Sequence, residues 1–275
     1  MEDPFRNALL AVEQACLALR LDFYVLGALA KEVWFRSERI ASRGTRDVDI
    51  AVFVSEEDQF QRLKELLIVD HAFTGSKENS FVLRAPGGIQ VDILPFGQLE
   101  VNNGVAVSGG GLNRIKVNGF KEVYFRNIAS ARVLEDREYK IATLPGIVLL
   151  KLIAYDDRPE QRDKDPLDCI AIIENYFELQ SNLIWDSHND LFSDNANLKM
   201  IAARVIGREM QGSLYENLQL RERIEKILGH HIELGERSSF VMKMASQTNA
   251  TIENCTEYLS EILNGIRDER TPAGI

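Results

Sequence analysis

The sequence predicts an α+β fold, a small mixed β-sheet with helices on one side, followed by a mainly helical second domain. Up to residue 94, apolar strand-like runs alternate with amphipathic helical stretches. Pro86-Gly87-Gly88 is a turn signal between two such runs, and beyond residue 140 the hydrophobic spacing is mainly helical. The composition turns charged near residues 134–140. We therefore expect a core domain of residues 1–135 and a helical domain of residues 136–275.

The expected elements follow from local patterns. In the first domain, helices are expected over residues 4–20, over 29–40 and from residues 55–58, where Ser55 can cap the helix. Strands are expected over 23–26, 47–53, 81–84 and 89–94. Short strand-like pieces are expected at 114–117 and 122–125. Gly109-Gly110-Gly111 predicts a flexible turn, because the lysine and helix that a phosphate loop requires do not follow it. In the tail, helices are expected over residues 196–211, 215–228 and 250–266.

The composition is that of a soluble globular protein. Hydrophobic residues make up 45% of the 275 residues and charged residues 27%. No apolar run approaches the roughly 20 residues that a membrane helix needs, and the acidic N-terminus does not resemble a signal peptide. Cys16, Cys169 and Cys255 are scattered without metal-type spacing. These features predict a cytoplasmic protein without a membrane partner.

A net charge of −10 gives no overall basic footprint for nucleic acid. An RNA partner would therefore need a local basic patch. The best candidate is a cluster of basic side chains around the motif described next, namely Lys31, Arg36, Arg39, Arg43 and Arg46. The alternative is that these residues solvate a helix face and pair with Glu32 and Glu38.

Two carboxylates stand one residue apart in Asp47-Val48-Asp49-Ile50, inside a run that otherwise predicts a buried strand. Because side chains alternate across a strand, Asp47 and Asp49 point to the same face. Two like charges at the start of an apolar strand are costly to desolvate. A bound Mg²⁺ or Mn²⁺ would remove that cost, since hard oxygen ligands suit these ions. The alternative is a strand end at which both carboxylates face water.

Two neighbouring runs favour the cation site. The apolar run 23–26 ends in Gly27-Ala28, and helical spacing follows; this layout aims backbone N–H groups at an anion such as phosphate. The predicted strand 89–94 carries Asp92 at its centre. If it pairs beside the first acidic strand, Asp92 joins Asp47 and Asp49 as a third metal ligand or as a base. The combination predicts a site for a nucleoside triphosphate (NTP) with metal ions.

These residues resemble the signature of polymerase-beta-type nucleotidyltransferases, in which a glycine pair or Gly-Ser precedes Asp-x-Asp and a later strand Asp. The run Arg43-Gly44-Thr45-Arg46-Asp47-Val48-Asp49 is most similar to the AbiEii-type nucleotidyltransferases, many of which are toxins. The resemblance implies a nucleotidyltransferase core in which Asp47, Asp49 and Asp92 are both catalytic and metal-binding. It also implies nucleotide binding by Gly27, Ala28, Thr45 and Arg46. Ala28 departs from the pattern, because many members have Gly or Ser there.

The second domain contains a lysine within an almost wholly apolar predicted helix that starts at Thr143-Leu144-Pro145. Lys151 either extends along its stem to solvent or contacts a phosphate in the cleft. Asp165-Pro166 starts the next helix, and Asp168 could simply complement the positive end of that helix. The run from Leu150 to Asp168 also resembles later AbiEii-type motifs. By that resemblance, which spans residues 21–175, Lys151 binds the triphosphate and Asp168 forms the nucleotide side of the cleft.

The resemblance implies a metal-dependent nucleotidyltransferase that moves a nucleoside monophosphate from an NTP to an acceptor hydroxyl, with Mg²⁺ or Mn²⁺ as cofactor. The toxin-like members imply RNA as the acceptor, tRNA 3′ ends in particular, and a cognate antitoxin protein as a partner. An antibiotic- or protein-modifying transferase is the alternative within the enzyme class. A non-catalytic nucleotide-binding partner protein is the alternative from another class; Ala28 favours it, and the three clustered carboxylates oppose it.

Overall fold

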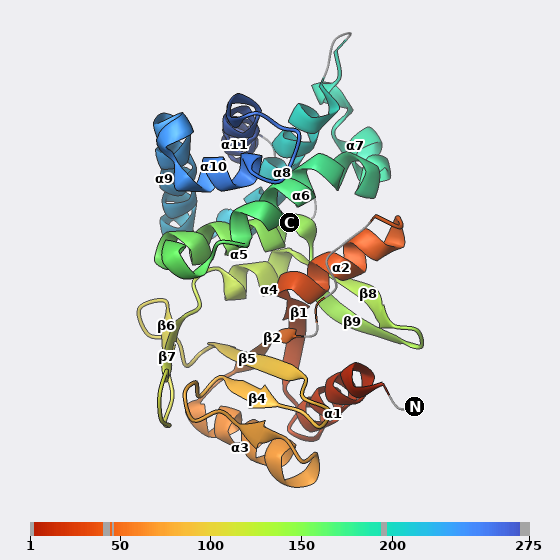
Figure 1. Ribbon diagram of the computed structural model, residues 1–275, viewed down its shortest axis with the longest axis vertical. Coiled ribbons are helices and arrows are strands. Elements are labelled where there is room, and N and C mark those ends of the chain that lie inside the picture. Colours follow the sequence, from red (N-terminus) through yellow and green to blue (C-terminus); the bar gives the residue numbers. More distant parts are fainter. Residues whose placement is uncertain (1–2, 41–44, 46, 194–196, 270–275) are drawn as a thin grey trace. The chain divides into compact units, whose positions relative to one another are not determined.

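A computed structural model describes residues 3–40, 45, 47–193 and 197–269 of the chain (Figure 1). The contacts divide into two compact units. The first unit comprises Met1–Arg36, Ile40–Tyr124 and Ile128–Ala142, and the second comprises Ser37–Arg39, Phe125–Asn127 and Thr143–Ile275. The first unit carries the sheet, and the elements described in the second unit beyond Thr143 are all helical. The predicted α+β class is therefore confirmed.

The first unit is built on a seven-stranded mixed sheet with the order β3-β4-β5-β2-β1-β9-β8. In the centre, β2 pairs parallel with β5 and antiparallel with β1, while β9 pairs parallel with β1. The strands are β1 Asp22–Leu26, β2 Val48–Val54, β3 Thr74–Gly75, β4 Val82–Arg84, β5 Gln90–Gly97, β8 Ile128–Leu134 and β9 Arg137–Ala142. A separate ribbon pairs β6 (Gly104–Ala106) with β7 (Arg114–Lys116).

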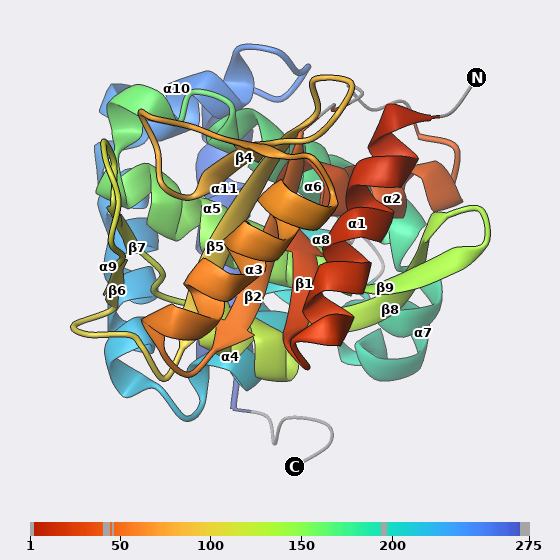
Figure 2. The same cartoon turned by 90° about the horizontal axis from the view of Figure 1, so that it is seen from below.

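Two long helices cover one face of this sheet. Helices α1 (Pro4–Ala18) and α3 (Glu57–Asp70) lie side by side across β1, β2 and β5 (Figure 2). Each contributes one apolar stripe, and Leu9, Val12, Phe60 and Leu63 are fully buried there. This is the helical periodicity that the sequence indicates for both segments.

The other face is also covered by a helix, so the prediction of helices on one side only is wrong. Tyr24 of β1 donates a hydrogen bond to the carbonyl oxygen of Phe120, at 3.1 Å, in α4 (Phe120–Arg126). Tyr124 of α4 stacks on Phe53 with a centroid distance of 5.7 Å and lies 5.4 Å from the Phe96 ring. Residues 122–125 are therefore helical, not strand-like, because Phe120 and Tyr124 reach the sheet at a spacing of four residues.

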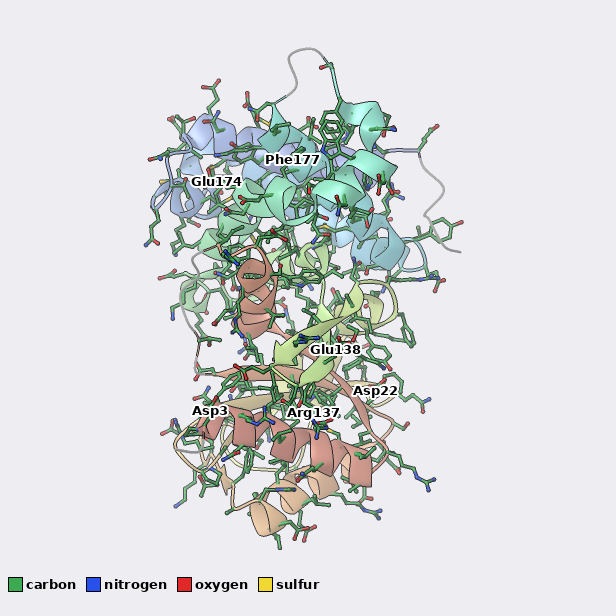
Figure 3. All side chains as sticks on the ribbon, turned by 90° about the vertical axis from the view of Figure 1, so that its right-hand side faces the viewer. Asp3, Asp22, Arg137, Glu138, Glu174 and Phe177 are labelled. Carbon is green, nitrogen blue, oxygen red and sulfur yellow. The ribbon has the colours of Figure 1, made fainter. Side chains whose placement is uncertain are left out.

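The β8–β9 hairpin was not predicted from the sequence, which indicated only a charged stretch over residues 134–140 and mainly helical structure beyond it. Most of its exposed side chains are charged, including Arg137 and Glu138 (Figure 3), so its composition resembles that of a linker. The buried side chains Tyr139 and Ile141 alternate with them, and Tyr139 donates a hydrogen bond to Glu13 of α1 at 2.9 Å. The contacts divide between Ala142 and Thr143. A boundary between independently folding domains at 135/136 stays a prediction.

The second unit is a set of helices joined by short turns. These are α5 Leu144–Asp157, α6 Asp165–Leu179, α7 Ser181–Ser187, α8 Leu198–Leu214, α9 Leu218–Leu234, α10 Ser239–Ala245 and α11 Ile252–Arg267. The predicted helix start at Ala196 lies outside the described residues. Within the part of the chain that is described, none of the helices is both long and apolar enough to cross a membrane.

Helix α9 continues through Gly229, where the sequence analysis ended it. A glycine costs an interior helical position only about 1 kcal/mol. Here the buried residues Ile227, Leu228 and His231 continue the apolar stripe past the glycine. Burial, together with the neighbouring His230, lowers the pKa of His231 to about 4, so the ring is neutral at pH 7; its Nδ1 lies 3.0 Å from Ser238 Oγ.

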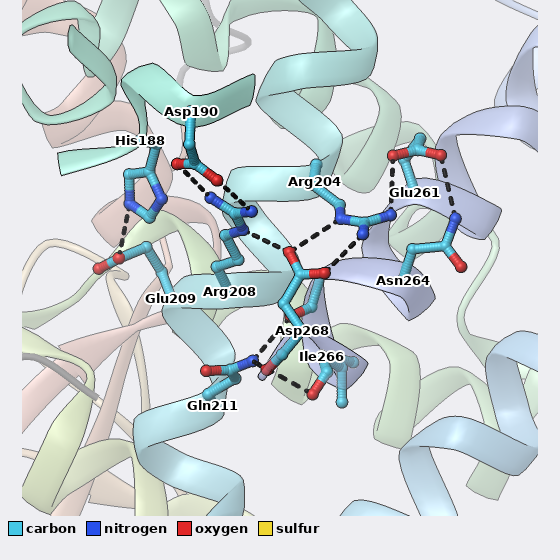
Figure 4. Close-up of polar contacts among 11 residues, drawn as sticks. His188, Asp190, Arg204, Arg208, Glu209, Gln211, Glu261, Asn264, Ile266 and Asp268 are labelled. Atoms are coloured by element: carbon cyan, nitrogen blue, oxygen red, sulfur yellow. Dashed lines mark hydrogen bonds and ion pairs between the residues drawn. The ribbon is translucent and has the colours of Figure 1, made fainter. Parts of the chain in front are cut away.

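Two glycines allow α8 and α11 to pack closely. A Cβ placed on Gly207 would lie 2.1 Å from the carbonyl oxygen of Ile262, and one on Gly265 would lie 2.1 Å from that of Arg204. Polar contacts join the same helices (Figure 4). The carboxylate of Asp268 accepts hydrogen bonds from Arg204 and Arg208, and Gln211 donates to the carbonyl oxygens of Gly265 and Asp268 at 2.9 and 2.7 Å.

We predict that Gly207→Ala lowers the free energy of unfolding by about 1–3 kcal/mol, because the new methyl group overpacks the α8–α11 contact. The matched control is Gly229→Ala, where a Cβ meets nothing within 4 Å. That change should raise the free energy of unfolding by up to about 1 kcal/mol through helix propensity alone. Urea denaturation of both variants measures the difference; equal effects would contradict the close approach of the two helices.

Candidate functional site

The register of two strands brings Asp49 and Asp92 together. Val48 pairs with Val91 and Asp49 pairs with Asp92 in the parallel β2–β5 ladder. Adjacent strands lie about 4.8 Å apart, and residues paired in register point to the same face. Both carboxylates are half-buried. The two acids that the sequence placed on separate strands are therefore neighbours.

Along β2 and β5, the side chains on this face change from acidic to aromatic. Phe53 and Phe96, four residues beyond the acids, are also paired in register and pack against Tyr124 of α4. At about 3.3 Å per residue, the aromatic contact lies roughly 13 Å along the strands from the carboxylates. The aromatic side chains pack this face of the sheet against α4 at one end, and the carboxylates lie at the other end.

Gly27 places a helix start against Asp49. It follows β1 directly and begins α2 (Gly27–Ser37), while Leu26 before it pairs with Asp49. Its φ angle is +67°, and a Cβ at this position would lie 2.1 Å from Asp49 Oδ2. Both the backbone conformation and the space therefore require glycine.

The start of α2 is suited to an anion. The first-turn N–H groups of a helix lack intrahelical partners and carry a partial positive charge. The first turn of α2 contains no acidic residue that would compete for these groups. Ala28 lies in this turn and is half-buried. Its methyl side chain offers no hydrogen bond, so any contact with phosphate at this position would come from the backbone.

Asp47 lies outside β2 and is exposed. Its backbone N–H donates a hydrogen bond to Thr45 Oγ1 at 3.2 Å. Among the described residues, no three His, Cys, Asp or Glu side chains are gathered closely enough to hold a metal ion. The structure thus assembles the pair Asp49–Asp92 and places Asp47 at the entrance of β2. The three-carboxylate site stays a prediction.

The Asp49–Asp92 pair has the donor chemistry that a hard divalent cation requires, because both side chains offer carboxylate oxygens on one face. Gln90, two residues before Asp92, donates a hydrogen bond from Nε2 to Asp92 Oδ1 at 2.9 Å. This contact was not predicted from the sequence. The alternation of side chains along β5, which puts residues 90 and 92 on one face, was the signal that could have found it.

The described members of the basic cluster are not all at the surface. Lys31 is 6% exposed, with its ammonium nitrogen 5.7 Å from the centroid of the Phe35 ring. Arg36 pairs with Glu32 at 3.2 Å, as the alternative interpretation expects. Arg43, Gly44 and Arg46 lie outside the described residues. An RNA-binding patch here stays a prediction.

Lys151 lies in the second unit within a buried ion-pair cluster. Its Nζ is 2.7 Å from Asp165 Oδ1 and 2.7 Å from Asp168 Oδ2, and all three side chains are almost wholly buried. Burial alone would lower the pKa of Lys151, but the two carboxylates outweigh it and hold the pKa above its usual value. The ammonium group therefore stays charged.

Asp165 was interpreted from the sequence only as the start of a helix. Both acids lie in the first turn of α6, and their i, i+3 spacing puts them on one face toward Lys151. Within the described part of the chain, Asp165 Oδ2 is buried and has no hydrogen-bond partner. With one ammonium and two carboxylates, the cluster has a formal charge of −1.

The sequence matches a family model described as nucleotidyl transferase AbiEii toxin, type IV TA system, over residues 15–249. The chain belongs to this AbiEii nucleotidyltransferase family. The resemblance seen in the glycine and aspartate motifs is thus confirmed. No curated protein matches the AbiEii chain significantly.

Two solved structures are similar to the AbiEii chain. One is the solution structure of the antibiotic-resistance factor ANT(2'')-Ia, with 12% identity and a TM-score of 0.39, covering 68% of this chain and 96% of the other. The second is an antigenic nucleotidyltransferase-like protein from Paracoccidioides brasiliensis, with 14% identity and a TM-score of 0.39, covering 68% and 90%.

We predict that Gly27→Ala destabilises this AbiEii chain more than Gly88→Ala does. Both glycines have positive φ, at +67° and +83°, so both changes incur a backbone strain of about 1–2 kcal/mol. Only Gly27 faces Asp49, because a Cβ on Gly88 meets nothing within 4 Å. The excess should largely disappear in an Asp49→Ala background. Urea denaturation of the single and double variants tests this; an excess that persists without the carboxylate would refute the contact.

We also predict that Lys151→Met lowers the free energy of unfolding by about 3–5 kcal/mol at pH 7, because it leaves two buried carboxylates uncompensated. Lys164→Met, which removes an exposed lysine next to Asp165, is the matched control and should change stability by less than about 0.5 kcal/mol. Urea denaturation gives both values. If Lys151→Met leaves stability unchanged but weakens NTP binding, the lysine serves the nucleotide and not the two acids.

Proposed function

We propose that this AbiEii-family chain is a metal-dependent nucleotidyltransferase that transfers a nucleoside monophosphate from an NTP to a hydroxyl group of RNA. One observation carries the proposal. Asp49 and Asp92 lie in register on β2 and β5, and Gly27 sets the start of α2 against Asp49. The carboxylate pair and a helix N-terminus suited to an anion thus lie next to each other in the first unit.

In the proposed reaction the acceptor oxygen forms a bond to the α-phosphorus, and the bond from that phosphorus to the bridging oxygen breaks. Pyrophosphate leaves with the electron pair. The first-turn N–H groups of α2 bind the triphosphate oxygens, and Asp92 orients the acceptor hydroxyl and accepts its proton. Asp49 and Asp92, with Asp47 at the entrance of β2, would hold Mg²⁺ or Mn²⁺. The metal ion would neutralise the developing charge and activate the hydroxyl.

Lys151 and Asp168 enter the proposal through the family resemblance. In the structure the ammonium group is shared between two carboxylates. An ammonium so compensated attracts a triphosphate weakly. We therefore propose that Lys151 contacts phosphate only when Asp165 or Asp168 turns to another partner, and that Asp168 then contributes to the nucleotide side of the site.

The proposed acceptor and biological role draw on the family. Its description names a toxin of a type IV toxin–antitoxin system, which supports a toxic transferase with a cognate antitoxin protein. RNA, and the 3′ end of tRNA in particular, is the proposed acceptor because it presents a free hydroxyl. Modification of a protein or a small molecule would appear as a different labelled product in the assay below.

The assay incubates the intact chain with each NTP labelled at the α-phosphate, Mg²⁺ and total RNA. We expect label on RNA of tRNA size, lost on chelation of the metal. Asp49→Asn and Asp92→Asn should each reduce transfer by about 100-fold or more, since each removes a metal ligand. Asp70→Asn, which alters an exposed acid at the end of α3, is the control. Transfer that survives Asp92→Asn would contradict the proposed site, and label on protein instead of RNA would contradict the acceptor.

A further inference from the structure

We propose that Glu32 of α2 is a positioning residue for Asp47, acting through Thr45. From the sequence, Glu32 is expected only as a possible partner for basic side chains. The inference rests on the proposed function, because the group it positions is a proposed metal ligand. It adds to that site a residue that touches neither metal nor nucleotide.

Both carboxylate oxygens of Glu32 are engaged. Oε2 accepts a hydrogen bond from the backbone N–H of Thr45 at 3.1 Å, and Oε1 accepts one from Arg36 Nη2 at 3.2 Å. The Glu32 side chain is 22% exposed, whereas that of Arg36 is 60% exposed. Arg36, one helical turn further along α2, thus orients a carboxylate whose other oxygen binds the segment before β2.

Thr45 passes this restraint on to Asp47. Its hydroxyl oxygen accepts a hydrogen bond from the backbone N–H of Asp47 at 3.2 Å. A threonine hydroxyl that accepts from the backbone N–H two residues later restrains that N–H group. Val48, directly after Asp47, is the first residue of β2 and pairs with Val91. Two successive hydrogen bonds therefore connect α2 to the residue that leads into the acidic strand.

Helix α2 makes a second contact near the acids, at its first residue. Gly27 at the start of the helix abuts Asp49, and Glu32 lies five residues later, or about 7.5 Å along the axis. One short helix thus approaches the chain on both sides of Asp47, at Thr45 and at Asp49. Asp49 is held by the sheet, but Asp47 precedes the strand and carries a charge that repels the neighbouring acids. The contact from Glu32 through Thr45 opposes that repulsion.

The simpler alternative is that Glu32 only forms a helix-surface ion pair with Arg36. Substitutions that remove one contact or both distinguish the two interpretations. Arg36→Met removes the ion pair but leaves Glu32 Oε2 able to accept from Thr45, whereas Glu32→Ala removes both contacts. Thr45→Val removes the hydroxyl and keeps the backbone N–H, and Thr45→Ser restores the hydroxyl.

The first measurement is amide hydrogen exchange in the intact, ligand-free chain. Glu32→Ala should accelerate exchange at residues 45 and 47, and Thr45→Val should accelerate it at residue 47 only. Thr45→Ser and Glu65→Ala, which removes an exposed carboxylate from α3, should leave these amides as in the wild type. Unchanged exchange in Glu32→Ala would overturn the proposal.

The second measurement is the affinity for Mn²⁺, followed by titration of free Mn²⁺, together with transfer in the assay described above. Glu32→Ala and Thr45→Val should each weaken Mn²⁺ binding and slow transfer roughly tenfold, the effect of losing about one hydrogen bond. Glu65→Ala should stay within about twofold of the wild type in both measurements. In Mn²⁺ affinity alone, Arg36→Met should also stay within about twofold, and Thr45→Ser should recover what Thr45→Val loses. If Glu32→Ala does not fold, the Thr45→Val and Thr45→Ser pair carries the test.

The outcomes distinguish this inference from the proposed function. Faster exchange with wild-type Mn²⁺ affinity and transfer would overturn the positioning role while leaving the proposed function intact. A wild-type chain that neither binds Mn²⁺ nor transfers a nucleotide would overturn the proposed function, and the positioning role with it. Faster exchange joined to weaker Mn²⁺ binding, with recovery in Thr45→Ser, supports both.

Discussion

The parallel register of β2 and β5 is the constraint on which the site depends. Val48 faces Val91 and Ile50 faces Ile93, and these apolar pairs are fully buried. A slip of one residue would move every side chain of β2 to the opposite face, burying Asp49 beneath α1 and α3. The burial of the valine and isoleucine side chains therefore keeps Asp49 and Asp92 side by side, although their charges repel each other.

Helix α2, which lies outside the sheet, adds a second constraint on the position of the acids. Its first residue is a glycine because Asp49 occupies the space where a Cβ would stand. Its middle carries Glu32, which reaches the segment before β2. The helix end that is suited to phosphate and the acids that are suited to a cation are thus held next to each other. Such preorganisation matters in phosphoryl transfer, because the protein contributes mainly positioning and charge stabilisation.

The clustered acidic side chains of the two units differ in burial and in their surroundings. Asp165 and Asp168 are buried and share the ammonium group of Lys151, which balances one of their two negative charges. Asp49 and Asp92 are half-buried and lie beside each other on one face. The first arrangement is suited to holding α5 and α6 together, whereas the second is suited to a cation supplied from solution. The proposed chemistry is placed on the β2–β5 face because two acids lie in register there.

The sequence by itself determined the α+β class, the family and the acids of the candidate site, because these depend on local periodicity and on motifs of a few residues. Helix α4, the β8–β9 hairpin and the passage of α9 through Gly229 were decided by tertiary structure. In each case a local signal was outweighed by packing: Phe120 and Tyr124 on the sheet, Tyr139 near α1, and the buried stripe of α9 around Leu228. The contacts of Glu32 with Thr45 and of Lys151 with Asp165 join segments 13 and 14 residues apart. No local pattern specifies such pairs, since the fold alone brings their side chains within hydrogen-bond distance.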